Sequence, residues 1–136
     1  MMAVRSATPE DLPFATRMMG QLWDAHGDTY DDAQITDRTA EVMEICDCYV
    51  LGDPPVAFAS LQDLGDYMLI RHFALENAER GKGKGRAAFE ALEAHAFPGR
   101  PSRLFASTTL PQPKAFWEKM GYGAFAYCMS RKGRAS

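Results

Sequence analysis

Glycines and cations alternate in one short segment of this 136-residue chain, residues 79–86, which reads Glu-Arg-Gly-Lys-Gly-Lys-Gly-Arg. The segment stands between an apolar run typical of a strand and a pattern typical of a helix. Alternate glycines let backbone N–H groups converge on a ligand, and a helix that begins beside them adds its unpaired N–H groups and its positive dipole end. The segment therefore predicts an anion site, most naturally for phosphate. The alternative is a solvated turn whose lysines only aid solubility.

Two common phosphate-binding patterns do not account for this segment. A Walker loop has the form GxxxxGK[ST], but the sixth position counted from Gly81 is Arg86, so a P-loop nucleotidase is excluded. Residues 83–88 do fit GxGxxA. However, the next predicted strand ends in Ser-Thr-Thr with no carboxylate for a ribose, and the chain is too short for two mononucleotide-binding halves. A dinucleotide-dependent dehydrogenase is therefore disfavoured.

The composition of the chain limits the classes of partner. Fifteen Lys and Arg against eighteen Asp and Glu leave a net charge of -3, so no positive field draws the chain to nucleic acid. No apolar run approaches the roughly 20 residues of a membrane helix, and the first residues are unlike a signal peptide. Three cysteines, with Cys46 and Cys48 too close to staple a fold, indicate reduced thiols and a cytoplasmic location. The spacing of Cys and His predicts no metal site.

Hydrophobic periodicity predicts a single α/β domain over residues 1–136. Thr8, Pro9 and Asp11 supply an N-cap, a first-turn proline and a first-turn carboxylate for the first helix, and Asp31 or Asp32 can cap the second. The predicted strands span residues 4–7, 48–51, 56–61, 67–75, 103–108 and 122–129, and the predicted helices span residues 9–27, 32–46, 86–97 and 113–120. The order of elements is β-α-α-β-β-β-α-β-α-β, with residues 48–51 and 56–61 forming an antiparallel hairpin.

Two motifs resemble those of a known enzyme family. Arg80-x-x-Gly83-x-Gly85, which follows Leu75 of the central predicted strand, is similar to the acyl-CoA-binding signature Q/R-x-x-G-x-G/A of the GNAT-type N-acetyltransferases. Residues 116–122, FWEKMGY, look like the later FYEKLGF-like segment of that family. The predicted order of elements matches the GNAT fold as well. The resemblance covers nearly the whole chain and implies a single GNAT-like domain with a mixed central sheet flanked by helices.

The resemblance implies transfer of an acetyl group from acetyl-CoA to a primary amine of a small molecule or peptide, by direct attack and without a metal. It implies that the loop wraps the CoA pyrophosphate, that the central strand binds the pantetheine arm through its backbone, and that this strand splays from the strand at residues 103–108. Homodimers are common in the family. The residues that the resemblance assigns to the cofactor are Phe73, Ala74, Leu75, Arg80, Gly81, Lys82, Gly83, Lys84, Gly85, Arg86 and Trp117.

Three positions depart from the family pattern. Trp117 stands where many relatives carry a tyrosine that donates a proton to the leaving CoA thiolate, and an indole cannot be that acid. Trp117 is therefore expected to pack against the cofactor arm, while Tyr122, Tyr127 or water remains as the acid if one is needed. Leu110 replaces a common asparagine, and Lys84 replaces a common aliphatic residue. These departures leave a CoA-binding module with little or no activity as the alternative function.

The central strand and the loop after the first helix hold the candidates for the acceptor side. Strict alternation places Arg71 and His72 on opposite faces, so both cannot face the acceptor. Arg71 could bind a carboxylate or phosphate of the acceptor, or pair with an acidic residue of the first two helices. His26 could act as a catalytic base or only cap its helix. Trp23 and Tyr30 could line the acceptor site or be ordinary residues at the edge of the core. Aspartates that could attract an amine, or simply cap a helix, are Asp24, Asp28, Asp31 and Asp32.

Overall fold

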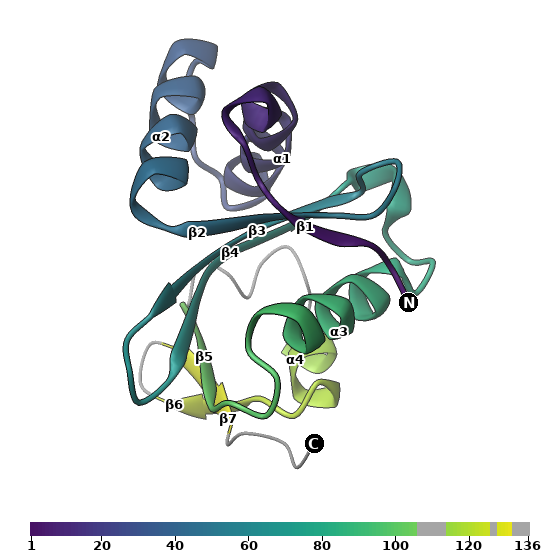
Figure 1. The fold of residues 1–136 in the computed structure, drawn as a ribbon. Coiled ribbons are helices and arrows are strands. Elements are labelled where there is room, and N and C mark those ends of the chain that lie inside the picture. Colours follow the sequence, from purple (N-terminus) through teal and green to yellow (C-terminus); the bar gives the residue numbers. More distant parts are fainter. Residues whose placement is uncertain (106–113, 126–127, 132–136) are drawn as a thin grey trace.

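The computed structural model describes residues 1–105, 114–125 and 128–131 (Figure 1). The strands are β1 (Val4–Ser6), β2 (Asp47–Leu51), β3 (Ala57–Asp63), β4 (Met68–Leu75), β5 (Ser102–Phe105), β6 (Gly123–Phe125) and β7 (Cys128–Arg131). The α-helices are α1 (Leu12–Ala25), α2 (Asp32–Ile45), α3 (Lys84–Ala96) and α4 (Lys114–Lys119), and two short 3-10 helices are η1 (Pro9–Asp11) and η2 (Asn77–Glu79). The predicted order of elements is confirmed as far as α4.

The described strands form one mixed sheet in the order β1-β2-β3-β4-β5-β7-β6. β4 and β5 are parallel, and the other neighbouring pairs of described strands are antiparallel. The predicted hairpin of β2 and β3 is confirmed. It turns at Gly52, which has a left-handed φ of 95°, and a Cβ there would lie 2.9 Å from Val56. Glycine is therefore required at this turn.

Helices cover both faces of the sheet, with α1 and α2 on one side and α3 and α4 on the other (Figure 1). The side of α1 and α2 has a core in which helix residues such as Met18 pack with Phe58 and Ala74 of the sheet. On the other side, Phe89 of α3 packs with residues such as Phe73 of β4. Since the sheet is buried on both faces, β3 and β4 are nearly continuous apolar runs rather than alternating ones.

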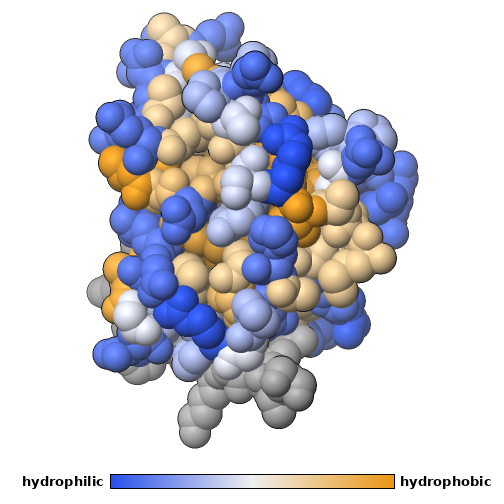
Figure 2. Space-filling model, viewed as in Figure 1, coloured by the Kyte–Doolittle hydropathy of each residue, from blue (hydrophilic) through white to orange (hydrophobic). Residues whose placement is uncertain are grey.

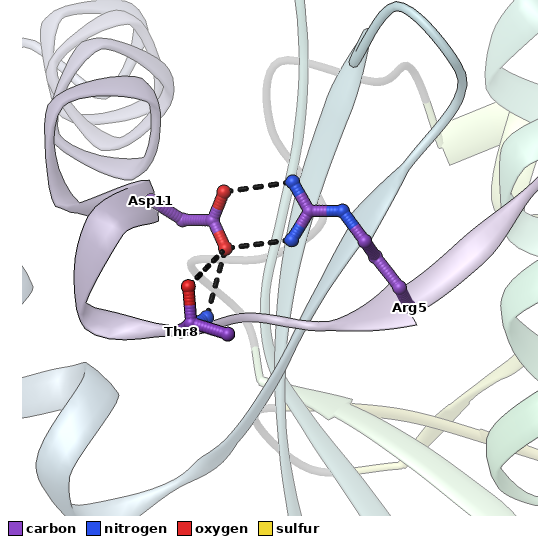
Figure 3. A network of polar contacts seen from close by, with 3 residues as sticks. All are labelled: Arg5, Thr8 and Asp11. Atoms are coloured by element: carbon purple, nitrogen blue, oxygen red, sulfur yellow. Dashed lines mark hydrogen bonds and ion pairs between the residues drawn. The ribbon is translucent and has the colours of Figure 1, made fainter.

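A polar network fixes the turn from β1 into α1, as Figure 3 shows. The guanidinium of Arg5 donates to both carboxylate oxygens of Asp11, at 2.7 and 2.8 Å, and the backbone N–H of Thr8 donates to Asp11 at 2.8 Å. The hydrogen bond from Arg5 is the main reason why the pKa of Asp11 falls to about 2. The predicted N-cap and first-turn carboxylate are confirmed. At α2, Asp31 is the cap, since its side chain accepts the backbone N–H of Gln34 at 2.8 Å.

A β-bulge at Arg71 changes which residues of β4 share a face. In the register with β3, His72 lies opposite Ser60 and Ile70 lies opposite Leu61, so Arg71 is an extra residue between them. Ile70 and Phe73 consequently both join the core under α3 and α4. Strict alternation would have put these two residues on opposite faces, so the prediction that Arg71 and His72 must face opposite ways is wrong.

The prediction of one continuous strand over residues 122–129 is also wrong. The chain forms two short strands there, β6 and β7, which pair with each other in antiparallel register from Gly123↔Ser130 to Phe125↔Cys128. The alternating apolar residues Phe125, Tyr127 and Met129 occur equally in one long strand and in two shorter strands that pair, so the sequence did not distinguish them. The predicted strand end at residues 106–108 lies outside the described residues, and the helix predicted from Arg86 begins at Lys84.

Hydrophilic residues cover much of the molecular face shown in Figure 2, with smaller hydrophobic areas between them. No helix in the described part of the chain is long and apolar enough to cross a membrane.

A cavity of about 290 Å³ lies between the start of α1 and the second half of α2, and Leu12, Ala40 and Met43 are among its lining residues. Its lining includes none of the residues predicted for the cofactor or the acceptor.

Candidate functional site

The predicted anion loop connects the end of β4 to the start of α3. After η2 the chain passes through Arg80 in an extended conformation. Gly81 and Gly83 then take left-handed φ values of 77° and 76°, and Gly83 is the N-cap of α3. Turns of this kind can direct successive backbone N–H groups to one side, and a glycine has no side chain with which to cap the first N–H groups of the helix. These N–H groups can therefore bind an anion.

The glycines of the loop have two different roles. A Cβ on Gly85 would lie 3.4 Å from the ring of Phe116 and 3.6 Å from the side chain of Leu75, so this glycine lets α3 pack closely on β4 and α4. A Cβ on Gly81 or Gly83 would meet no described atom within 4 Å. The space beside Gly81 and Gly83 is thus open for a ligand to approach the backbone.

Arg80 brings a buried donor to the same loop. Its Nε is buried and has no hydrogen-bond partner among the described residues, and burial lowers the pKa of the guanidinium. A buried donor without an acceptor costs about 1–3 kcal/mol, which a bound ligand can recover. Guanidinium groups pair well with phosphate, since their donors match its oxygens. The residues of the loop therefore fit the phosphates of CoA.

The other cations of the loop lie at the surface. Lys82 and Lys84 are exposed, so both can reach an anion bound at the loop. Arg86 is also exposed, and its Nε donates to Glu90 one turn further along α3, at 2.6 Å. In this structure Arg86 supports α3, while the lysines are available to a ligand.

The far half of β4 presents an unpaired backbone edge. In the described residues, β5 pairs with β4 at Met68, Leu69 and Ile70, whereas β3 pairs with β4 as far as Leu75. The backbone edge of residues 73–75 that faces away from β3 therefore has no strand partner in the described part of the chain. An extended ligand can bind such an edge through backbone hydrogen bonds. Phe73, Ala74 and Leu75 make up this open edge, and their contact with a cofactor stays a prediction.

Helix α1 is tied to the start of the anion loop. The guanidinium of Arg17 donates to the carboxylate of Glu76, directly after β4, at 2.6 Å. The side chain of Gln21 accepts the backbone N–H of Asn77 at 3.0 Å. These contacts hold the middle of α1 beside the junction of β4 and η2.

Trp117 lies in the core rather than on a surface. Its side chain is completely buried, and its ring makes edge-to-face contacts with centroid distances of 4.9 to 5.9 Å. The rings around it are Phe73, Phe89, Phe116 and Tyr122. Trp117 is thus part of the core under α3, and its packing against a cofactor arm stays a prediction.

Tyr122 is buried as well. Its hydroxyl shares a hydrogen bond of 2.6 Å with the hydroxyl of Ser102, at the start of β5. This pairing does not favour Tyr122 as a proton donor to a leaving thiolate. Leu110, which departs from the family pattern, and Tyr127, the other candidate acid, lie outside the described residues.

Aromatic side chains gather on the α1 face of β4, where the acceptor was expected. Trp23 contacts Tyr30 and His72 edge to face, with centroid distances of 5.6 and 6.2 Å. The guanidinium of Arg38 from α2 stacks over the ring of Tyr30 at 4.2 Å. The structure thus brings the predicted pair Trp23 and Tyr30 together with His72, a residue that the sequence analysis did not select.

The bulge turns Arg71 toward the same face. Its guanidinium donates to the side chain of Gln62 at 3.0 Å, and it influences the pKa values of His72 and Cys46. His26 occupies the C-cap position of α1, with its backbone N–H bonded to the carbonyls of Leu22 and Trp23. A catalytic part for His26, and acceptor binding by Arg71, stay predictions.

His72 and Ser60 form the polar pair of this face. The serine hydroxyl lies 2.7 Å from Nδ1 of the imidazole, across neighbouring strands. Burial is the main cause that lowers the pKa of His72 to about 4, and the charges of Arg71 and His26 lower it further. His72 is therefore neutral at neutral pH. Sequence reasoning missed the pair because it depends on the register of β3 against β4, for which neither segment carries a local signal.

Within the described residues, no group of three or more His, Cys, Asp or Glu side chains is placed to hold a metal ion. Cys46 and Cys48 are free thiols, and burial is the main cause that raises the pKa of Cys48 to about 12. A thiol with such a pKa is a poor nucleophile. The candidate site thus consists of the anion loop, the open edge of β4 and the aromatic face beside α1.

Several solved structures similar to this chain are named as acetyltransferases. The ribosomal-protein-S18-alanine N-acetyltransferase of Escherichia coli is 18% identical, with 100% of this chain and 96% of that chain covered and a TM-score of 0.71. An acetyltransferase from Thermus thermophilus is 17% identical, with 97% of each chain covered and a TM-score of 0.74. The PaiA N-acetyltransferase of Thermoplasma acidophilum, solved in complex with coenzyme A, is 14% identical, covers 97% and 99%, and has a TM-score of 0.65. At these identities, the likeness shows a shared fold.

No curated protein matches this chain. The model of the acetyltransferase (GNAT) family matches residues 13–122, a span that runs from the first turn of α1 to the residue before β6. It includes the anion loop, the whole of β4 and the aromatic face. This chain therefore belongs to the acetyltransferase (GNAT) family.

Proposed function

We propose that this chain transfers an acetyl group from acetyl-CoA to a primary amine of a small molecule or peptide, by direct attack of the amine. The observation that carries the proposal is the junction of β4 and α3. There, Gly81 and Gly83 expose the backbone, the first turn of α3 has no side-chain cap, and Arg80 holds a buried donor without a partner among the described residues. Membership of an acetyltransferase family supports the same conclusion.

Each part of the site has one task in this proposal. Bound acetyl-CoA supplies the acetyl group as a thioester. The N–H groups of residues 81–85 bind its pyrophosphate, and Arg80, Lys82 and Lys84 neutralise the phosphate charge. The open edge of β4 at residues 73–75 binds the pantetheine arm. The aromatic face of Trp23 and Tyr30 receives the amine.

Peptide N-termini belong among the acceptors to be tested. One similar structure is named as a ribosomal-protein-S18-alanine N-acetyltransferase, so a free amino terminus is one form of acceptor found on this fold. We place the reaction in the cytoplasm, where free thiols such as those of Cys46 and Cys48 remain reduced.

The test is acetyl transfer itself. The chain is incubated with acetyl-CoA and separate pools of amino acids, polyamines, aromatic amines and tripeptides with free amino termini, and thiol release is followed. At least one pool is expected to accelerate thiol release, with a product whose mass has increased by one acetyl group. N-terminally blocked versions of the same tripeptides are the matched control and should have no effect. Binding of acetyl-CoA without acceleration by any pool would contradict the proposal.

The second candidate is a CoA-binding module with little or no turnover. It is favoured by Trp117, an indole that cannot supply the proton, and by Tyr122, a candidate proton donor that is buried and whose hydroxyl is bonded to Ser102. The same incubation separates the two candidates. The binding module predicts acetyl-CoA binding of normal strength and no acetylated product from any pool.

A further inference from the structure

The hydrogen bond between Ser60 and His72 is not among the groups proposed to bind the cofactor. Ser60 is completely buried in β3, whereas His72 keeps part of its surface exposed. The bonded nitrogen, Nδ1, lies 2.7 Å from the serine hydroxyl. One edge of the imidazole is thus held inside the sheet, and the other ring nitrogen, Nε2, is not used by this bond.

His72 lies between the open edge of β4 and the aromatic face beside α1. It directly precedes Phe73, the first residue of the open edge of β4, and its ring contacts Trp23 of the aromatic face. β4 contains no Asp or Glu that could take a proton instead. The guanidinium of Arg71 has donors and no acceptor for a proton, and Glu76 after the strand is paired with Arg17 at 2.6 Å. His72 is therefore the neutral base that β4 offers at this place.

We propose that His72 is the catalytic base that accepts a proton from the acceptor amine, and that Ser60 is the residue that positions it. In this arrangement Nδ1–H donates to the serine oxygen, which leaves the lone pair of Nε2 for the amine proton. The inference rests on the proposed function, because it names the base of that reaction.

The nitrogen of the amine forms a bond to the carbonyl carbon of the thioester, and the carbon–sulfur bond breaks. The proton lost by nitrogen passes to Nε2, and the CoA sulfur leaves as a thiolate that takes a proton from water. The imidazolium then returns its proton to solvent, which it does readily because its surroundings disfavour the charged form.

The groups around His72 are consistent with a neutral ring. Arg71 on its own strand and His26 at the end of α1 are the charges that act on it, and both oppose its protonation. From β3 it faces the uncharged Ser60, and from α1 it faces the uncharged Trp23. Above a pH of about 4, His72 is thus in the form that can accept a proton.

The tautomer of His72 tests the inference without any acceptor. Long-range nitrogen–proton NMR spectra of the uniformly labelled protein separate the two ring nitrogens of each of its three histidines, and loss of one set of signals in His72→Asn assigns His72. The inference predicts a proton on Nδ1 and none on Nε2 at neutral pH. A proton on Nε2 would overturn it, since the serine would then be the donor and no lone pair would be left for the amine.

Kinetics supply the second test, with thiol release measured on the same amine pools. His72→Asn and His72→Gln should lower kcat by about 100-fold or more, while the Kd of acetyl-CoA from calorimetry changes by less than about twofold. Ser60→Ala should lower kcat by a smaller factor, and Ser60→Thr should restore part of the loss because it keeps a hydroxyl. His95→Asn, on α3, is the matched control and should leave kcat unchanged.

The outcomes separate this inference from the proposed function. Thiol release by the unmodified protein that persists in His72→Asn overturns the assignment of the base and leaves acetyl transfer intact. A loss in His72→Asn that is matched by equal loss of acetyl-CoA binding also overturns it, because the residue would then be structural. Absence of thiol release with every pool overturns the proposed function, and this inference with it.

Discussion

Asp11 shows how one side chain joins two elements of this fold. It accepts hydrogen bonds from Arg5 in β1 and from the backbone of Thr8, and it ends η1, from which α1 continues. Asp11→Asn should therefore lower the free energy of unfolding at neutral pH by about 1–2 kcal/mol, since it removes the charge and half of the bidentate pair. Urea unfolding followed by circular dichroism measures this change.

The pKa of Asp11 also predicts how this difference depends on pH. Because the pKa falls from 3.8 to about 2 in the folded chain, the stabilisation is present above pH 3.8 and is lost as the pH falls toward 2. The difference between the unmodified protein and Asp11→Asn should shrink in that range. Asp63→Asn removes a similar but exposed ion pair with Arg100, and it should lower the free energy of unfolding by less than Asp11→Asn does. An equal effect of both variants would contradict this account.

His72 predicts a second pH dependence in a different range. The pKa of His72 is lowered from 6.5 to about 4 by folding, so between these values the unfolded chain binds a proton that the folded chain does not. Stability is therefore full above pH 6.5 and decreases as the pH falls toward 4, by an amount on the order of 3 kcal/mol at most.

Urea midpoints at pH 7.5 and 4.5 measure this contribution. His72→Asn should lose clearly less stability between these two pH values than the unmodified protein, because it removes the proton that only the unfolded chain binds. His95→Asn should behave like the unmodified protein. The same loss in all three proteins would show that the folded environment does not oppose protonation of His72.

The elements differ in how well the sequence predicted them. Capping residues and helical periodicity predicted α1 and α2 because those signals act within one or two turns. The bulge at Arg71 depends on how β4 is aligned with β3, and no glycine or proline marks it. The pairing of His72 with Ser60 depends on the same alignment. The anion loop was predictable because glycines and a helix start are local, whereas the residues on the acceptor face are brought together only by the fold.

The junction of β4 and α3 predicts the effect of changing its glycines. Gly83 has a φ of 76°, so Gly83→Ala should destabilise the fold by roughly 1–2 kcal/mol through backbone strain, although its Cβ meets no described atom. Gly83→Asn should cost less, because asparagine tolerates the left-handed conformation better. Urea unfolding provides the measurement.

Gly20 in α1 is the matched control for this prediction. Its backbone is helical, and a Cβ there would lie 3.6 Å from Ile35, an ordinary contact. Gly20→Ala should be neutral or stabilising by up to about 1 kcal/mol, since alanine favours a helix. If Gly83→Ala and Gly20→Ala had the same effect, the left-handed conformation at Gly83 would not be a source of strain.

The molecule as a whole has two cores that share one sheet. The chain has two tryptophans, and they report on opposite sides, Trp23 at the edge of the core under α1 and Trp117 inside the core under α3. Because both cores need the same strands, the two sides should unfold together. In Trp23→Phe and Trp117→Phe, the remaining tryptophan should give a fluorescence midpoint in urea equal to the midpoint from circular dichroism.

In each variant, the fluorescence midpoint is compared with the circular dichroism midpoint of the same protein, and the two variants together cover both sides of the sheet. Trp117→Phe should be the less stable of the two, because Trp117 is completely buried and Trp23 is not. A fluorescence midpoint that differs from the circular dichroism midpoint in either variant would show that one side unfolds before the other.

Binding of acetyl-CoA at the junction of β4 and α3 is the claim on which the proposed reaction depends, and calorimetry tests it most directly. Acetyl-CoA is titrated into the unmodified protein, Arg80→Met and Lys119→Met, with NADH as the comparison ligand. The account predicts micromolar binding of acetyl-CoA, no signal for NADH, binding weakened by more than about tenfold in Arg80→Met, and no change in Lys119→Met. Absence of acetyl-CoA binding, or equal binding by Arg80→Met, would contradict it.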